Sequence, residues 1–138
     1  MTATVYMLDT DTCIFLMRGE SPALAARVQT IALQHQVMSA VTFAELSYGV
    51  RASAAAKRKQ NQAVLDNLAL HLAVLDWPQE AALHCAEIRF DLKKRGAQLG
   101  AADLMIAAHA RVMEATVVTN NTKDFGRVRG LQVENWLK

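Results

Sequence analysis

Short apolar runs alternate along the chain with longer segments in which apolar residues recur at helical spacing. The runs predict strands at residues 5–8, 37–40, 72–75, 116–119 and 131–134. The segments between them predict helices at 10–18, 22–34, 42–50, 53–71, 79–95 and 101–114, and a loop or short helix at 120–129. Strands that alternate with helices form a parallel sheet covered on both faces, and such sheets bind ligands at the carboxyl ends of their strands. The pattern therefore predicts an α/β fold with a site at that edge.

Local signals define several helix boundaries. Gly19 closes the first helix, and Ser21 followed by Pro22 begins the second. Thr42 and Glu45 have the spacing of a capping box, which opens the helix at 42–50. The expected apolar stripe of the helix at 79–95 consists of Ala82, Leu83, Ala86 and Phe90.

Composition narrows the class of protein. The chain has 138 residues, of which 52% are hydrophobic, with six Gly and two Pro, as expected for one compact domain over residues 1–138. Its net charge of +2 is too small to indicate nucleic-acid binding by bulk charge, so any basic surface is local. Cys13 and Cys85 lack metal-ligand spacing, and no segment resembles a secretory leader or a membrane span. We expect a cytoplasmic protein without a zinc module.

Four carboxylates occupy positions where a merely solvated acid is unusual. Asp9 ends an apolar strand, and Asp103 lies on an apolar stripe in the first turn of its helix. That stripe continues through Ile106, Ala107 and Ala110. Glu45 stands among apolar neighbours, and Asp124 follows the strand at 116–119 after a short loop. Each acid is near the end of an element, where parallel strands bring side chains together.

Clustered carboxylates repel one another unless a cation compensates their charge. Mg²⁺ prefers oxygen ligands and keeps several waters, so carboxylates from separate elements suit it better than zinc, and the chemistry favoured is phosphodiester hydrolysis. Simpler roles stand beside this one. Glu45 can close the capping box, Asp103 can stabilise the helix dipole, and Asp9 can cap a strand end. Asp124 can be a solvated loop acid, and we expect Asp11 to be the N-cap of the first helix.

Four separated blocks of sequence, together with the C-terminal residues, carry a family resemblance. They read YMLDTD at 6–11, VTFAELSYG at 41–49, GAADLMIAAHA at 100–110 and VTNNTKDF at 118–125, with GL at 130–131 and ENW at 134–136. In this order they resemble the PIN-domain ribonucleases, specifically the VapC toxins of type II toxin–antitoxin pairs, and the resemblance covers the whole chain. It implies an α/β/α sandwich with a mainly parallel sheet and an endoribonuclease that depends on Mg²⁺ or Mn²⁺.

The resemblance also implies a set of site residues. Asp9, Glu45 and Asp103 match the catalytic acids, and Asp9 and Asp103 match the metal ligands. A fourth acid usually comes from the block at 118–125. Here Asn121 stands where many relatives carry Asp, so we expect Asp124 to complete the site and Asn121 to orient a water or a ligand.

The partners implied by the resemblance are a VapB-like antitoxin and structured RNA, often tRNA. It further implies a homodimer, and contact with operator DNA only through the antitoxin. Three local groups of basic residues can supply phosphate contacts, or can be ordinary solvated surface. These groups are Lys57–Lys59, Lys93–Arg95, and Lys123 with Arg127 and Arg129.

Other classes of function account for fewer residues. Asp9 and Asp11 after an apolar strand resemble the first motif of haloacid dehalogenase-like phosphatases, but only nineteen residues follow Thr119, too few for that family's remaining motifs. A non-catalytic PIN-like binding module is the other alternative. We expect His109, six residues after Asp103, to lie on the helix surface and not to act as a base.

Overall fold

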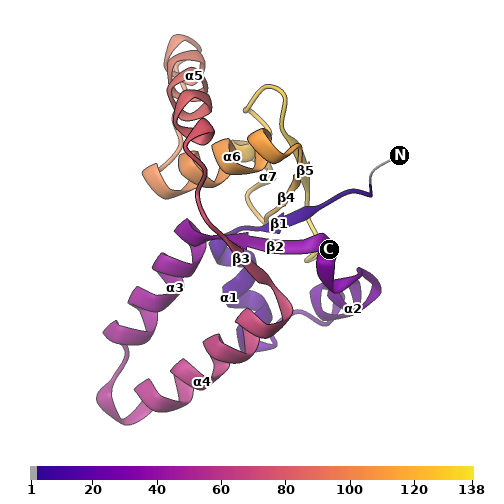
Figure 1. Ribbon diagram of the computed structural model, residues 1–138, viewed down its shortest axis with the longest axis vertical. Coiled ribbons are helices and arrows are strands. Elements are labelled where there is room, and N and C mark those ends of the chain that lie inside the picture. The colour runs from indigo at the N-terminus through magenta and orange to yellow at the C-terminus, as the bar shows by residue number, and fades with distance from the viewer. Residues whose placement is uncertain (1–2) are drawn as a thin grey trace.

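The structure is a computed structural model that describes residues 3–138 (Figure 1). Its five strands are β1 (Tyr6–Leu8), β2 (Gln36–Ser39), β3 (Ala73–Leu75), β4 (Thr116–Val118) and β5 (Gln132–Glu134). Its helices are α1 (Thr10–Arg18), α2 (Pro22–Thr30), the 3₁₀ turn η1 (Leu33–His35), α3 (Ala40–Ala52), α4 (Ala55–His71), α5 (Glu80–Lys94), α6 (Ala101–Met113) and α7 (Thr122–Phe125). Within residues 3–138, no helix has the length and apolar character to cross a membrane.

All five strands are parallel, in the order β3-β2-β1-β4-β5. Because side chains alternate along a strand, the sheet presents a different apolar set to each side. Met7, Val37 and Val117 pack on one side with residues of α5 and α6. On the other side, Leu8, Met38 and Val118 pack with residues of α1 to α4. Figure 1 shows α5, α6 and α7 on one side of the sheet and α1 to α4 on the other, which confirms the predicted α/β/α sandwich.

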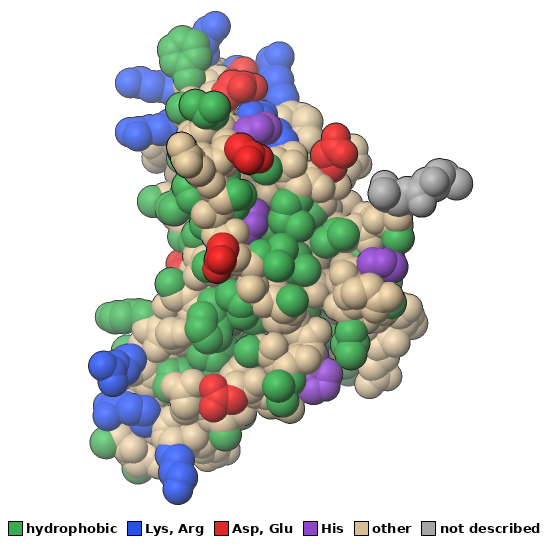
Figure 2. Space-filling view, viewed as in Figure 1, with side chains coloured by type: hydrophobic (Ala, Val, Ile, Leu, Met, Phe, Trp, Pro, Cys, Tyr) green, Lys and Arg blue, Asp and Glu red, His purple; other side chains and the backbone are tan. Residues whose placement is uncertain are grey.

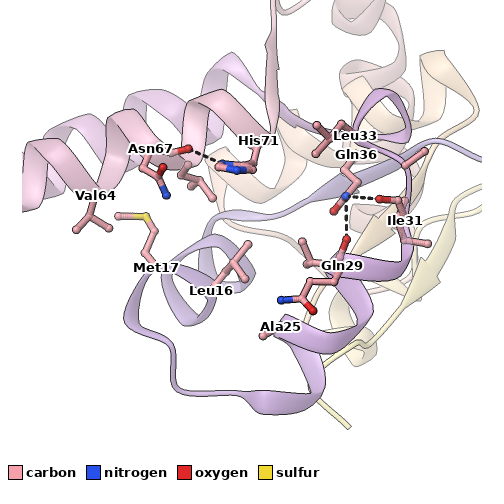
Figure 3. Close-up of a pocket in the computed structure, with 13 residues that line it drawn as sticks. Leu16, Met17, Ala25, Gln29, Ile31, Leu33, Gln36, Val64, Asn67 and His71 are labelled. Atoms are coloured by element: carbon pink, nitrogen blue, oxygen red, sulfur yellow. Dashed lines mark hydrogen bonds between the residues drawn. The ribbon is translucent and has the colours of Figure 1, made fainter.

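The second helix is shorter than predicted. The sequence pattern extends it to Gln34, but α2 ends at Thr30 and η1 follows. Buried Gln36 explains the early end, because its Nε2 donates to the carbonyl oxygens of Val28 at 3.1 Å and Ile31 at 2.9 Å (Figure 3). These bonds satisfy the carbonyl groups that a longer helix would have used.

Gln36 also borders an open groove between α1, α2, η1 and α4 (Figure 3). The groove is lined mainly by apolar side chains, and none of its lining residues is an acid. It is therefore separate from the carboxylates that the sequence singles out.

The predicted apolar stripe of α5 is wrong. Leu83 is 76% exposed and Phe90 is 66% exposed, whereas Ala81, Ile88 and Leu92 are buried. The residues Ala81, Ile88 and Leu92 recur at helical spacing and form the face that packs with α6 in one apolar cluster. Two apolar stripes compete on this helix, and the packing partner selects one of them.

Candidate active site

Asp9 lies at the carboxyl end of the central strand β1. Its backbone N–H donates to the carbonyl oxygen of Val118 on β4 at 3.0 Å, which fixes its position beside the neighbouring strand. Its side chain accepts a hydrogen bond from the N–H of Thr12 at 2.9 Å and so caps α1. The prediction that Asp11 caps this helix is wrong: Asp11 lies in the first turn and is exposed.

Burial governs the chemistry of Asp9. Only 3% of the residue is exposed, and this burial raises the pKa of its carboxyl group. Hydrogen bonds from Thr119 and Thr12 oppose the rise, because they favour the charged carboxylate. Thr119 directly follows β4, so its contact with Asp9 depends on the pairing of β1 with β4. The sequence pattern did not single out either threonine, although each is a polar residue at the edge of an apolar run.

Asp103 stands in the first turn of α6, in a partly buried position. Burial, followed by the negative charges of the neighbouring acids, raises its pKa from 3.8 to about 6. The acids that act on it are Asp9, Asp11, Glu45 and Asp124, in decreasing order. Each of the other three acids that the sequence singles out, and Asp11 as well, is thus near enough for its charge to act on Asp103.

Glu45 projects from α3 toward the start of α1. Its Oε1 accepts a short hydrogen bond from the hydroxyl of Thr10, the first residue of α1. The predicted capping box with Thr42 is wrong, because α3 begins at Ala40 and Ser39 caps it by accepting from the N–H of Val41 at 3.1 Å. Glu45 lies beyond the first turn, so its carboxylate is not used in capping and is held toward α1 instead.

Asp124 and Asn121 lie together at α7. The Nδ2 of Asn121 donates to Asp124 Oδ2 at 3.1 Å, and Arg127 forms an ion pair with Asp124 Oδ1 at 3.5 Å. Asp124 has the smallest influence on the pKa of Asp103 among the four acids. Its carboxylate already has two partners, whereas that of Asp103 has no hydrogen bond or ion pair with another side chain among residues 3–138.

The carboxylates fit a divalent cation of the magnesium type. The donors are oxygens. Burial, and then repulsion by the other acids, raises the pKa of Asp103, and a bound cation would stabilise the charged carboxylate against both effects. Within residues 3–138, no three His, Cys, Asp or Glu side chains are grouped closely enough to hold a metal ion. Mg²⁺ usually binds through one or two carboxylates and keeps several waters, so Asp9 and Asp103 suit an open site of this kind.

His109 is buried, contrary to the prediction of a surface histidine. Its Nδ1 lies 2.9 Å from the Oγ of Ser39, and it is 1% exposed. Burial lowers the pKa of its imidazole, so the neutral form is favoured. The pair connects the middle of α6, the helix of Asp103, to the N-cap of α3, the helix of Glu45.

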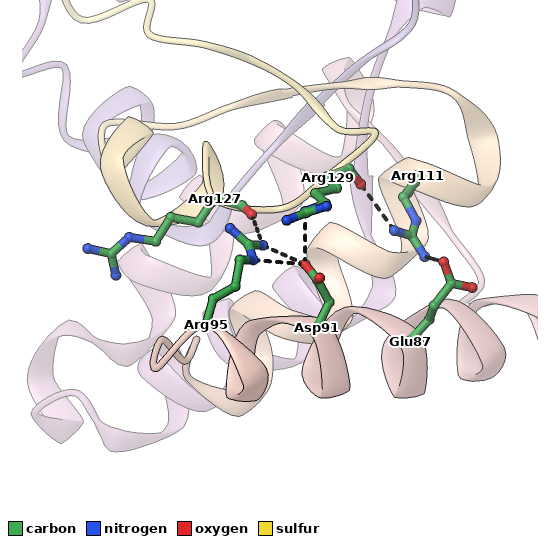
Figure 4. A network of polar contacts seen from close by, with 6 residues as sticks. All are labelled: Glu87, Asp91, Arg95, Arg111, Arg127 and Arg129. Carbon is green, nitrogen blue, oxygen red and sulfur yellow. Dashed lines mark hydrogen bonds and ion pairs between the residues drawn. The ribbon is translucent and has the colours of Figure 1, made fainter.

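Most arginines near α5 are engaged within the protein (Figure 4). Asp91 pairs with Arg95 at 2.6 Å and with Arg129 at 3.6 Å. Arg111 pairs with Glu87 at 3.1 Å. Figure 2 shows Lys and Arg side chains gathered at the two ends of the elongated face, with acids between them. Of the predicted basic group at 123–129, both arginines therefore have acidic partners.

Known proteins that are similar to this chain are nucleases of one family. The PIN domain family matches residues 6–131. The chain is 37% identical over 131 residues to the tRNA(fMet)-specific endonuclease VapC of Salmonella typhimurium, which covers 95% of this chain and 97% of the relative. It is 36% identical over 135 residues to ribonuclease VapC2 of Rickettsia felis, which covers 97% of this chain and 99% of the relative.

Solved structures agree in fold. The structure of VapBC2 from Rickettsia felis bound to a promoter DNA fragment contains a chain with TM-score 0.90 and 34% identity, covering 96% of this chain and 99% of that one. The structure of DNA-bound VapBC from Salmonella typhimurium contains a chain with TM-score 0.89 and 36% identity. The match covers 97% of this chain and 99% of that one. The match to the PIN domain family excludes the haloacid dehalogenase-like phosphatase as an alternative. This chain belongs to the PIN domain family and, within it, to the VapC ribonucleases.

Proposed function

We propose that this chain is the toxin of a type II toxin–antitoxin pair and a metal-dependent endoribonuclease that hydrolyses phosphodiester bonds in structured RNA, with tRNA as its substrate class. The observation that carries the proposal is the position of Asp103, whose pKa is raised to about 6 by burial and by the charges of acids from separate elements, Asp9 and Glu45 among them. A carboxyl group whose pKa is raised by burial and by neighbouring negative charges is typical of a functional site, and a cation would stabilise its charged form. The names of the relatives support RNA as the substrate.

Each residue has a separate task in this mechanism. Asp9 and Asp103 would bind the metal, and the hydrogen bonds from Thr12 and Thr119 favour the charged form of the Asp9 carboxylate against the effect of its burial. A bound Mg²⁺ or Mn²⁺ ion supplies the activation of water and the neutralisation of charge on the phosphoryl oxygens. Glu45, oriented by Thr10, positions the attacking water and accepts its proton at a carboxylate oxygen.

Asp124 completes the site by a weaker contribution. Its carboxylate adds negative charge near Asp103, while Asn121 and Arg127 fix its orientation. Asn121 therefore serves as a positioning residue for Asp124.

Cleavage of RNA by the purified chain tests the proposal. With Mg²⁺ or Mn²⁺ we expect discrete fragments of total RNA on a sequencing gel, and with EDTA we expect intact RNA. Comparison of initiator tRNA with elongator tRNAs then defines the substrate, because one relative is named for tRNA(fMet). Intact RNA after incubation of folded protein with either metal would contradict the proposal and favour the non-catalytic PIN-like binding module.

The similar structures support an antitoxin partner. They are complexes of VapC with VapB, two of them bound to DNA. We propose that a small VapB-like antitoxin blocks the acidic site of this chain and that operator DNA is contacted through the antitoxin. A cytoplasmic location agrees with such an RNA substrate and with the free thiols of Cys13 and Cys85.

Exposed apolar side chains support a homodimer. Leu83 and Phe90 on α5 and Tyr48 on α3 are each more than half exposed. We expect sedimentation equilibrium of the purified chain to give the mass of a dimer, and Phe90→Glu to shift it toward the monomer because a charge disfavours apolar contact. A monomeric wild-type chain would contradict this part of the proposal.

A further inference from the structure

A pocket of about 470 Å³ lies between the last turns of α5, the loop after it and the start of α6. Its interior is apolar, with Leu92, Leu99 and Leu104, and its exposed lining residues include Arg89, Lys93 and Gln98. This volume is within the roughly 300–1,000 Å³ that is usual for sites of small ligands. The pocket thus combines an apolar interior with two cationic side chains in its exposed lining.

The end of α5 shapes the pocket. Gly96 has a φ of 71°, and after it the N–H of Ala97 donates back to the carbonyl oxygen of Leu92 at 2.9 Å. This turn reverses the chain, so that residues 97–99 form one wall. A side chain at position 96 would strain the left-handed backbone that the reversal requires.

The two cations of the pocket remain available. Arg89 and Lys93 are one turn apart on α5, and neither forms an ion pair with another of residues 3–138. Their neighbours behave differently: Arg95 pairs with Asp91, and the Lys94 ammonium lies 5.3 Å from the ring of Phe90 and does not line the pocket. Of the basic run at 93–95, therefore, only Lys93 lines the pocket, and Lys94 and Arg95 contact other side chains.

The pocket lies at the start of the helix that carries Asp103. Ala101 and Leu104 line it, whereas Asp103, in the same turn of α6, is not among its lining residues and faces the other acids. The pocket and the acidic site therefore lie on different faces of the first turn of α6. An RNA strand that continues from the acidic site around this turn would bring a nucleotide to the pocket.

We propose that the pocket binds one unpaired nucleotide of the RNA, in the strand that carries the cleaved bond. The base packs on the leucines, its phosphate lies between Arg89 and Lys93, and the Gln98 amide hydrogen-bonds to the edge of the base. Proteins recognise RNA sequence mainly through such unstacked bases, held by packing and read by hydrogen bonds. This inference rests on the proposed function and assigns part of its substrate specificity.

Binding without cleavage tests the pocket apart from catalysis. In Asp103→Asn protein with EDTA, fluorescence anisotropy measures the Kd of labelled heptaadenylate, heptacytidylate and heptauridylate. We expect Lys93→Ala to raise the Kd about fivefold and to reduce the slope of log Kd against log salt by about 0.7, the value for one phosphate contact on single-stranded RNA. Lys94→Ala is the matched control, with the same charge loss on the next residue, and we expect its Kd to change less than about twofold.

Gln98→Ala tests recognition of the base. We expect the parent protein to bind the three oligonucleotides with different Kd values, and Gln98→Ala to reduce those differences without changing the salt slope. Equal effects of Lys93→Ala and Lys94→Ala, or equal affinity of the parent for all three RNAs, would overturn the inference. Failure of the wild-type chain to cleave RNA contradicts the proposed function but does not alter these binding results, so the two failures are distinguishable.

Discussion

Replacing Asp103 with Asn is expected to reduce RNA cleavage at least about 10³-fold, equivalent to a loss of about 4 kcal/mol of transition-state stabilisation. The amide keeps the shape of the side chain but removes the charge that binds the cation. Asp9→Asn is expected to have a similar effect, because Asp9 supplies the other proposed metal ligand. The measurement is the initial rate of tRNA cleavage at saturating Mg²⁺. A metal-induced rise in Tm of the wild type, absent from Asp103→Asn, gives a second readout that does not depend on activity.

The pH dependence of stability is expected to distinguish this loss of cleavage from unfolding. In the folded protein without metal, Asp103 keeps its proton up to about pH 6, whereas its ordinary pKa is 3.8. The folded state therefore binds more protons between these values, and stability falls as pH rises through them. Above pH 6 we expect Asp103→Asn to be more stable than the wild type by about 1 kcal/mol, after discounting for partial exposure, with no difference below pH 4.

A second carboxylate provides the control for the cleavage rate of Asp103→Asn. Asp124→Asn is the matched control, since the same change at a carboxylate that already has Asn121 and Arg127 as partners is expected to have a smaller effect on cleavage. Full activity in folded Asp103→Asn would remove this residue from the mechanism.

Phe125→Ala is expected to destabilise the protein by about 3–5 kcal/mol, the usual cost of deleting a buried phenyl ring. Phe125 is fully buried in the cluster that includes Ala107 and Val117. Helix α7 has only four residues, too few for stability in isolation, so this ring attaches it to the core. Urea denaturation followed by circular dichroism measures the change in free energy of unfolding.

A conservative substitution of Phe125 separates the effect of lost apolar volume from the effect of losing the aromatic ring. Phe125→Leu retains most of the apolar volume, and we expect a cost of roughly 1–2 kcal/mol. Because α7 also carries Asp124, the alanine variant should lose part of its cleavage activity even where it remains folded. A loss of stability below about 1 kcal/mol for Phe125→Ala would show that α7 is held by other contacts.

Local pattern was sufficient for much of this fold. The apolar runs located every strand, because the middle residues of each strand are apolar and pack in the core, while polar residues such as Gln36 and Thr116 stand at the strand ends. Gly19 ended α1 as predicted, with the φ of 64° that glycine adopts easily. Asp9 and Asp103 were found because an acid next to buried positions violates the pattern around it.

Pattern failed where two local solutions were equally good. Asp9 and Asp11 can each cap α1, and the backbone bond of Asp9 to Val118 on β4 makes Asp9 the cap. Thr42 begins a credible capping box, yet Ser39 lies one residue before the helix and takes that role. In each case, a neighbouring strand fixes the backbone, and the sequence near the helix does not contain that strand.

By itself, the sequence determined the alternation of strands and helices, the acids at strand and helix ends, and the family, because these depend on residue type and spacing along the chain. Only the tertiary structure decided that Thr119 reaches Asp9, that His109 contacts Ser39 inside the protein, and that α5 buries Ile88 while exposing Phe90. The strand order β3-β2-β1-β4-β5 brings these distant segments together. Contacts of this kind are selected by the combined packing of elements far apart in sequence, which no local pattern encodes.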